Sequence, residues 1–133
     1  MSDFRFVPKK MILYFHEILI KRYGGNPGLR DEALLDSALE QPRQTFDGKL
    51  LHGSIYHAAA AYGYHLCGNH PFIDGNKRIA FVTMDVFLQQ NGLEIIASEK
   101  EAYEMMALLS NGDLSKEELT QWLEKHTRRG TET

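Results

Sequence analysis

The sequence has one cysteine, four prolines and no long apolar run among its 133 residues. A single cysteine excludes an intrachain disulfide, and the apolar neighbours of Cys67 favour a buried thiol in a reducing compartment. The most apolar stretch, residues 58–64, is far shorter than the ~20 residues that a membrane span requires. Residues 1–6 lack the continuous apolar segment of a secretion signal. We therefore expect a cytoplasmic protein that does not contact membranes.

Neither sign of charge dominates. The chain carries 15 Lys and Arg against 18 Asp and Glu, a formal net charge of -3, so no strong field attracts nucleic acid. Apolar residues make up 43% and charged residues 25%, which is ordinary for a globular domain and argues against disorder. We expect one domain over residues 1–126 with a flexible polar tail over 127–133, and no direct nucleic-acid binding.

Apolar residues recur at helical spacing along most of the chain. This spacing and the flanking Gly and Pro residues predict helices over 8–23, 31–41, 54–68 and 75–90. The last two would form a central helical hairpin, and the alanine-rich arm over 54–68 would pack deeply.

Two further helices have explicit start signals. Ser98 with Glu101, and Ser115 with Glu118, have the spacing of capping boxes. Residues 93–97 form a β-branched run that can pair as a short strand, whereas residues 43–53 show no period and predict a loop or flap. The predicted fold class is all-α, a mainly helical bundle with at most one small strand pair.

Chemically capable residues are concentrated in His-Pro-Phe-Ile-Asp-Gly-Asn-Lys-Arg, residues 70–78, where the second arm of the hairpin begins. Free N–H groups and the helix dipole make such a position an anion site, and Gly75 allows close approach to the backbone. Lys77 and Arg78 fall in the first turn, where each cation costs ~0.3–1 kcal/mol unless an anion compensates it. The pattern predicts a phosphate ligand.

Three neighbouring residues complete a candidate reaction centre. His70 has the side chain of a general base near neutral pH, and a loop could direct it at a hydroxyl beside the phosphates. Asp74 can hold Mg²⁺, which uses one or two carboxylates when it bridges phosphates. Phe72 alternates with these polar positions and would anchor the loop inward. Together they indicate phosphoryl or nucleotidyl transfer by positioning and charge neutralisation, without a covalent enzyme intermediate.

The same residues also fit a purely structural interpretation. Asp74-Gly75 is a common turn, and Asp74 could be the N-cap of the next helix. Lys77 and Arg78 would then be solvated surface residues. Residue types and spacing alone do not decide between the two interpretations.

Residues 70–78 resemble the signature of the Fic/Doc superfamily, His-Pro-Phe-x-Asp/Glu-Gly-Asn-x-Arg, which lies at the joint of a central helical hairpin. Every fixed position is matched. Residues 28–32 and 34–39 also resemble the death-on-curing (Doc) branch. Fic enzymes that transfer AMP usually have Gly between the Asn and the Arg, and a second Arg three residues later. This chain has Lys77 and Phe81 there, as Doc proteins do.

The resemblance implies a Fic/Doc-like fold and a toxin that passes the terminal phosphate of ATP to a Ser or Thr hydroxyl of a target protein. In the Doc branch that target class is elongation factor Tu, so translation would be blocked. By position, His70 would activate the hydroxyl and Asp74 would take Mg²⁺. Gly75 and Asn76 would supply the anion hole.

Lys77 and Arg78 would grip the ATP phosphates. The resemblance further implies a small antitoxin partner with a disordered inhibitory segment that folds on binding. Two alternatives remain open: AMP transfer of the Fic type, and a non-catalytic module that binds a partner or a nucleotide through the same pocket.

Overall fold

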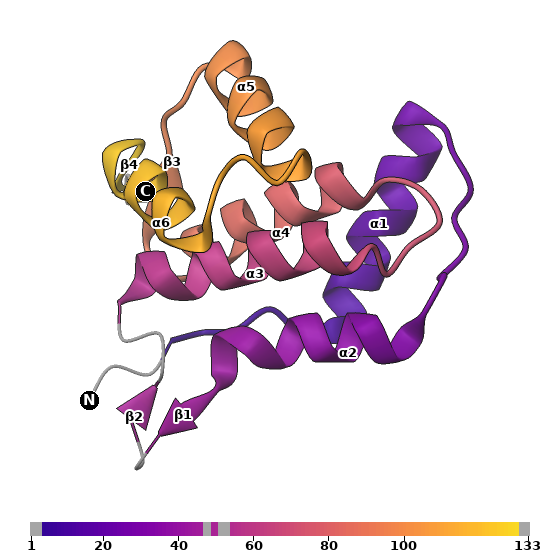
Figure 1. Cartoon of the computed structure of the whole chain (residues 1–133), viewed down its shortest axis with the longest axis horizontal. Helices are drawn as coiled ribbons and strands as arrows, with labels where there is room; N and C mark the ends of the chain where they lie inside the picture. The colour runs from indigo at the N-terminus through magenta and orange to yellow at the C-terminus, as the bar shows by residue number, and fades with distance from the viewer. Residues whose placement is uncertain (1–3, 47–48, 51–53, 131–133) are drawn as a thin grey trace.

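The computed structural model of the chain describes residues 4–46, 49–50 and 54–130, and their architecture is mainly helical (Figure 1). The helices are α1 (Lys9–Tyr23), α2 (Glu32–Glu40), α3 (Ile55–Asn69), α4 (Asn76–Gln90), α5 (Glu99–Ser110) and α6 (Lys116–Lys125). A 3₁₀ turn, η1 (Gln41–Arg43), follows α2. The short strands are β1 (Thr45–Phe46), β2 (Lys49–Leu50), β3 (Leu93–Ile95) and β4 (Thr127–Arg129). The all-α fold class predicted from the sequence is confirmed.

Helices α3 and α4 form the central hairpin, and the other helices pack around them. Helix α3 buries its alanines at positions 58–61 together with Tyr62 and Leu66. These small side chains, with Gly63, let α4 approach closely, since a Cβ on Gly63 would lie 2.3 Å from Met84 Sδ. Helices α2 and α6 pack against α3, and α1 packs against α4. The joint between α3 and α4 therefore faces the connection from α1 to α2 (Figure 1).

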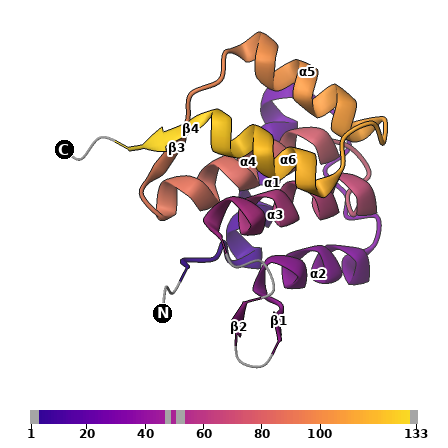
Figure 2. The same cartoon turned by 60° about the vertical axis from the view of Figure 1, so that its left-hand side comes forward.

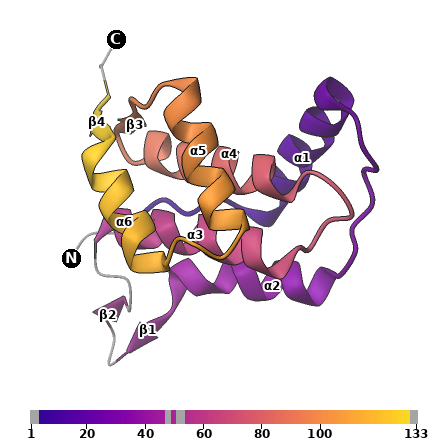
Figure 3. The same ribbon diagram turned by 45° about the horizontal axis from the view of Figure 1, so that its top comes forward.

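Helices α5 and α6 begin at the predicted capping boxes. Ser98 Oγ accepts the N–H of Glu101, and the Glu101 carboxylate accepts the N–H of Ser98. Ser115 and Glu118 repeat this exchange at the start of α6. Both helices cover the hairpin on the side away from α2 (Figure 3). None of the described helices is long and apolar enough to cross a bilayer.

Strand β3 confirms the strand predicted within 93–97, and it pairs antiparallel with β4 (Figure 2). The sequence predicted a flexible tail over 127–133, but the structure places Thr127–Arg129 in β4, where Leu93 pairs with Arg129. The backbone of this segment has strand partners, which its polar sequence does not reveal. Residues 131–133 of the predicted tail lie outside the described part of the chain.

A second strand pair lies inside the segment that the sequence predicts to be a loop or flap, residues 43–53. Strands β1 and β2 pair antiparallel, with Thr45 opposite Leu50, and project from the helical body (Figure 2). This pair adds to the one small pair that the sequence allowed. Residues 47–48 and 51–53 of the predicted flap lie outside the described residues.

Candidate functional site

His70 ends α3 in an unusual backbone conformation. Its φ of 48° and ψ of 55° are left-handed, and it is the one non-glycine residue with positive φ in the described part of the chain. This conformation costs an L-residue about 1–2 kcal/mol, so contacts elsewhere must hold it. The side chain is exposed, and its imidazole has no hydrogen-bond partner among the described residues. The ring is therefore accessible to a substrate from solvent.

The loop that follows His70 is fastened to the connection between α1 and α2. The carbonyl of Pro71 accepts the N–H groups of Arg30 at 2.7 Å and Asp31 at 3.0 Å. The N–H of Ile73 donates to the carbonyl of Gly28 at 3.0 Å. The Arg30 guanidinium also donates to the last carbonyls of α3. The conformation of the hairpin joint thus depends on residues about one-third of the chain away.

Phe72 lies beneath the loop and is 1% exposed. Its ring stacks on His16 of α1, with centroids 3.7 Å apart and planes 13° apart. His16 is itself buried and donates its Nε2–H to the carbonyl of Asp74, 2.8 Å away. Because a carbonyl can only accept, this contact requires the proton on Nε2. Helix α1 therefore supports the loop from below through one ring stack and one hydrogen bond.

The side chain of Asn76 closes the loop instead of facing a ligand. Its Nδ2 donates to the carbonyl of Phe72 at 2.9 Å, and its Oδ1 accepts the N–H of Phe72 at 3.0 Å. Sequence reasoning assigned Asn76 to the anion site and missed this contact. With its amide engaged, Asn76 can offer a phosphate its backbone N–H, at the first residue of α4.

The N-terminus of α4 is electropositive. Its N-cap is Gly75, with φ of 83° and no side-chain cap, and its first turn contains no acidic residue. The first N–H groups of a helix lack intrahelical acceptors. Lys77 and Arg78 are exposed there, and among the described residues neither has an acidic side chain within ion-pair distance. Backbone and side chains together favour an anion at this position.

A cavity of about 610 Å³ opens beside this helix end, between α1, α4 and α5. Gly75, Asn76, Lys77 and Arg78 line one part of it. The remaining wall is mainly apolar and comes from residues Leu19, Tyr23, Phe81, Val82, Ala102, Tyr103, Met106 and Ala107. The structure thus brings together the four residues that the sequence predicted for phosphate binding, while His70 and Asp74 lie on the adjoining loop.

Tyr23, at the end of α1, contributes to the cavity in a way that the sequence did not indicate. The guanidinium carbon of Arg78 lies 4.4 Å from the centroid of the Tyr23 ring. A cation above an aromatic face is attracted by its quadrupole, which restrains the arginine without neutralising its charge. Arg78 therefore keeps its full charge for a ligand. Phe81 adds an apolar surface to the cavity.

Asp74 does not cap α4, so the N-cap role that was one alternative from the sequence is wrong. Its Oδ2 accepts the N–H of Asn26 at 2.7 Å, and its side chain is exposed. Its Oδ1 has no hydrogen-bond partner among the described residues. Among all the described residues, no group of three or more His, Cys, Asp or Glu side chains is placed so that it could hold a metal ion. One carboxylate suits Mg²⁺ that takes its other ligands from phosphates and water.

Cys67 lies less than one turn before the end of α3, next to the joint, and is buried. Burial raises the pKa of the Cys67 thiol, and the nearby positive charge of Lys77 opposes this rise. A buried, protonated thiol is a poor nucleophile. Cys67 is therefore a core residue next to the site and not part of its chemistry.

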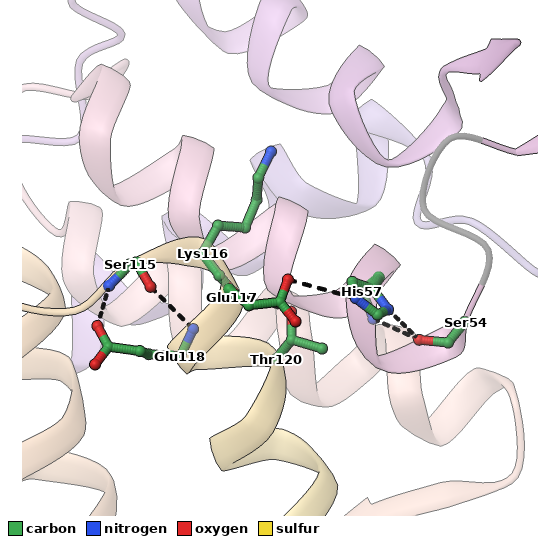
Figure 4. A network of polar contacts seen from close by, with 7 residues as sticks. All are labelled: Ser54, His57, Ser115, Lys116, Glu117, Glu118 and Thr120. Carbon is green, nitrogen blue, oxygen red and sulfur yellow. Dashed lines mark hydrogen bonds and ion pairs between the residues drawn. The ribbon is translucent and has the colours of Figure 1, made fainter.

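A second polar cluster lies where α6 meets the start of α3 (Figure 4). His57 Nδ1 is 2.6 Å from Ser54 Oγ, and His57 Nε2 is 3.7 Å from the Glu117 carboxylate. The order of Ser, His and Glu resembles a nucleophile with its base. However, Ser54 Oγ also accepts the N–H of His57 as the N-cap of α3. The cluster serves to cap α3 and connect it to α6.

A helical hairpin with this joint defines a known class of proteins. The model of the Fic/DOC family matches residues 6–88, which run from just before α1 to near the end of α4, and the chain belongs to this family. Within it, the chain is 37% identical over 75 residues to the protein named Toxin Doc of Mycolicibacterium smegmatis. That alignment covers 56% of this chain and 58% of the relative.

A second relative is aligned over a longer segment. The protein named Protein kinase doc of Escherichia phage P1 is 27% identical over 100 residues, which cover 74% of this chain and 77% of that protein. Both relatives are named as Doc proteins, so the similarity places the chain beside the Doc branch of the family, as residues 28–32 and 34–39 indicated.

Proposed function

We propose that this protein is a Doc-type toxin that transfers the terminal phosphate of ATP to a Ser or Thr hydroxyl of a target protein. One observation carries the proposal: an uncapped helix N-terminus, with two cations that have no acidic partner among the described residues, lines a cavity, and the exposed imidazole of His70 lies at the other end of the loop that leads into this helix. A phosphate chain supplies the negative charge that this arrangement lacks. The likeness to a relative named Protein kinase doc supports phosphate transfer in particular.

The two parts of the cavity suit the two parts of ATP. The N–H groups at the start of α4, with Lys77 and Arg78, would hold the phosphates. The apolar wall that includes Phe81 and Met106 would take the base. Mg²⁺ bound at Asp74 would neutralise phosphate charge. The Asp74 carboxylate, which accepts the N–H of Asn26 and directly precedes Gly75 of the cavity lining, would hold that ion.

His70 would act on the hydroxyl of the target. Its imidazole takes the hydroxyl proton while the oxygen forms a bond to the terminal phosphorus. The bond from that phosphorus to the bridging oxygen breaks, and ADP leaves with this oxygen. Lys77 and Arg78 stabilise the charge that develops on the transferred group and on ADP. No covalent intermediate with the protein is required.

The proposal extends to the partners of the protein. The target would be a translation factor, elongation factor Tu, whose phosphorylation would block translation in the cytoplasm. A small antitoxin with a disordered segment that folds on binding would restrain the toxin. The relative named Toxin Doc supports the antitoxin part of this extension.

A split-label assay tests the proposal. The protein is incubated with Mg²⁺, a bacterial lysate and ATP labelled at either the terminal or the innermost phosphate. We expect terminal label on one lysate protein, which mass spectrometry would identify. Innermost label would instead indicate AMP transfer, and no label from either ATP would indicate a non-catalytic binding module.

The role of His70 is tested in the same assay. His70→Ala should abolish transfer while the helical circular dichroism stays unchanged. His57→Gln is the matched control, because His57 lies on the same helix at its other end and its loss should leave transfer intact. Wild-type transfer by His70→Ala would refute the general-base role.

A further inference from the structure

Arg30 connects the α1–α2 segment to the last two carbonyls of the first hairpin arm. Its Nε donates to the carbonyl of His70 at 2.6 Å, and its Nη2 donates to the carbonyl of Asn69 at 2.9 Å. Its backbone N–H donates to the carbonyl of Pro71 at 2.7 Å. One residue therefore contacts three consecutive carbonyls that surround the bend of the chain at His70.

These contacts occur where the backbone needs support. The backbone of His70 has left-handed φ and ψ, a conformation that glycine or asparagine usually adopts at helix ends. Another residue keeps this conformation only when contacts with its surroundings hold it there. The carbonyls at a helix C-terminus also carry partial negative charge, which a guanidinium satisfies. The side chain of Asn69 adds a further restraint by donating to the carbonyl of Leu34 at 3.0 Å.

We propose that Arg30 is a positioning residue that holds the left-handed backbone of His70 and thereby fixes the direction of its imidazole. This inference rests on the proposed function in so far as His70 is the general base. Arg30 does not line the cavity, whose cationic part comes from Lys77 and Arg78. Loss of Arg30 should therefore impair the chemical step and leave nucleotide binding unchanged.

The guanidinium is suited to this task because its N–H groups form a planar fork, and two of them, on Nε and Nη2, reach neighbouring carbonyls together. A lysine ammonium keeps the charge but is a point donor. Arg30→Lys should thus restore part of what Arg30→Gln loses. Arg128→Gln is the matched control, since Arg128 is an exposed arginine that donates to Glu94 on the β3–β4 pair.

The first experiment reads the backbone directly and needs no activity. In NMR spectra of the labelled full-length protein, the positive φ of His70 gives a strong intraresidue Hα–HN NOE. We expect this NOE to weaken in Arg30→Gln, to weaken less in Arg30→Lys and to persist in Arg128→Gln. An unchanged His70 NOE in Arg30→Gln would overturn the inference, and Arg30→Lys decides the matter should Arg30→Gln fail to fold.

The second experiment separates kcat from KM for ATP. We expect Arg30→Gln to lower kcat by about 10–100-fold, the effect of a slightly misdirected catalytic group, with KM for ATP unchanged. A raised KM with unchanged kcat would make Arg30 a nucleotide contact and overturn the inference. Wild type that transfers nothing would refute the proposed function, while the NOE would still test Arg30.

Discussion

Gly63 sits where the two arms of the hairpin touch, and replacing it by alanine tests how that contact is built. A Cβ there would lie 2.3 Å from Sδ, 2.8 Å from Cε and 2.9 Å from Cγ of Met84, which is fully buried. Overpacking a core costs about 1–3 kcal/mol. Alanine in a helix interior stabilises the helix by about 1 kcal/mol relative to glycine, which offsets part of this cost. The net effect of Gly63→Ala should be a loss of up to about 2 kcal/mol in the free energy of unfolding.

Gly68 provides the matched control, because it lies in the same helix and a Cβ there would meet no atom within 4 Å. Gly68→Ala should stabilise the protein by about 0.5–1 kcal/mol. Urea unfolding followed by circular dichroism gives both values. In a Met84→Ala background, where the obstructing side chain is gone, Gly63→Ala should turn from destabilising to stabilising. The reasoning would be refuted if Gly63→Ala were as stable as Gly68→Ala in the wild-type background.

Three further predictions concern the site and the hairpin. Asn76→Ala should destabilise the protein by about 1–3 kcal/mol in urea unfolding, because both polar groups of the Phe72 backbone lose their partner; an unchanged midpoint would contradict the loop-closing role. Asp74→Ala should raise the Mg²⁺ concentration needed for half-maximal transfer, and an unchanged Mg²⁺ titration would exclude Asp74 as a ligand. Burial raises the pKa of the Asp85 carboxyl group above its ordinary value of 3.8. The carboxyl proton is therefore bound more tightly in the folded protein than in the unfolded chain, and ionisation of Asp85 at neutral pH lowers the free energy of unfolding. Asp85→Asn should therefore be more stable than wild type at neutral pH, and this advantage should vanish as the pH falls through the raised pKa to below the ordinary range; a difference independent of pH would contradict the argument.

Features with a local cause could be predicted from the sequence. The capping boxes at Ser98 and Ser115 depend on residues three positions apart. The helices were predicted from the spacing of apolar residues along one face, which is also a local pattern. Features made by distant residues were missed. Strand β4 exists because Thr127–Arg129 meets β3, more than thirty residues earlier, and its two arginines do not suggest a strand. The hairpin with β1 and β2 likewise shows no period of its own.

The candidate site also has one part that could be predicted from the sequence and one part that could not. The electropositive start of α4 follows from adjacent residues, and the structure gives it a cavity. The side-chain roles of Asn76 and Asp74 could not be predicted, because the Phe72 backbone and the N–H of Asn26 compete with any ligand for those groups. No sequence pattern shows that Arg30 and His16 support the joint.

The dependence of the joint on His16 and Arg30 limits how far its nine residues can be transplanted. Grafted alone into another helical hairpin, residues 70–78 would keep their chemical groups but lose the ring beneath Phe72 and the fork that holds the bend. A working graft would have to bring the first helix and the segment after it as well. In a search for related proteins, a match to the short pattern is stronger when the sequence also has an arginine that could reach the same carbonyls.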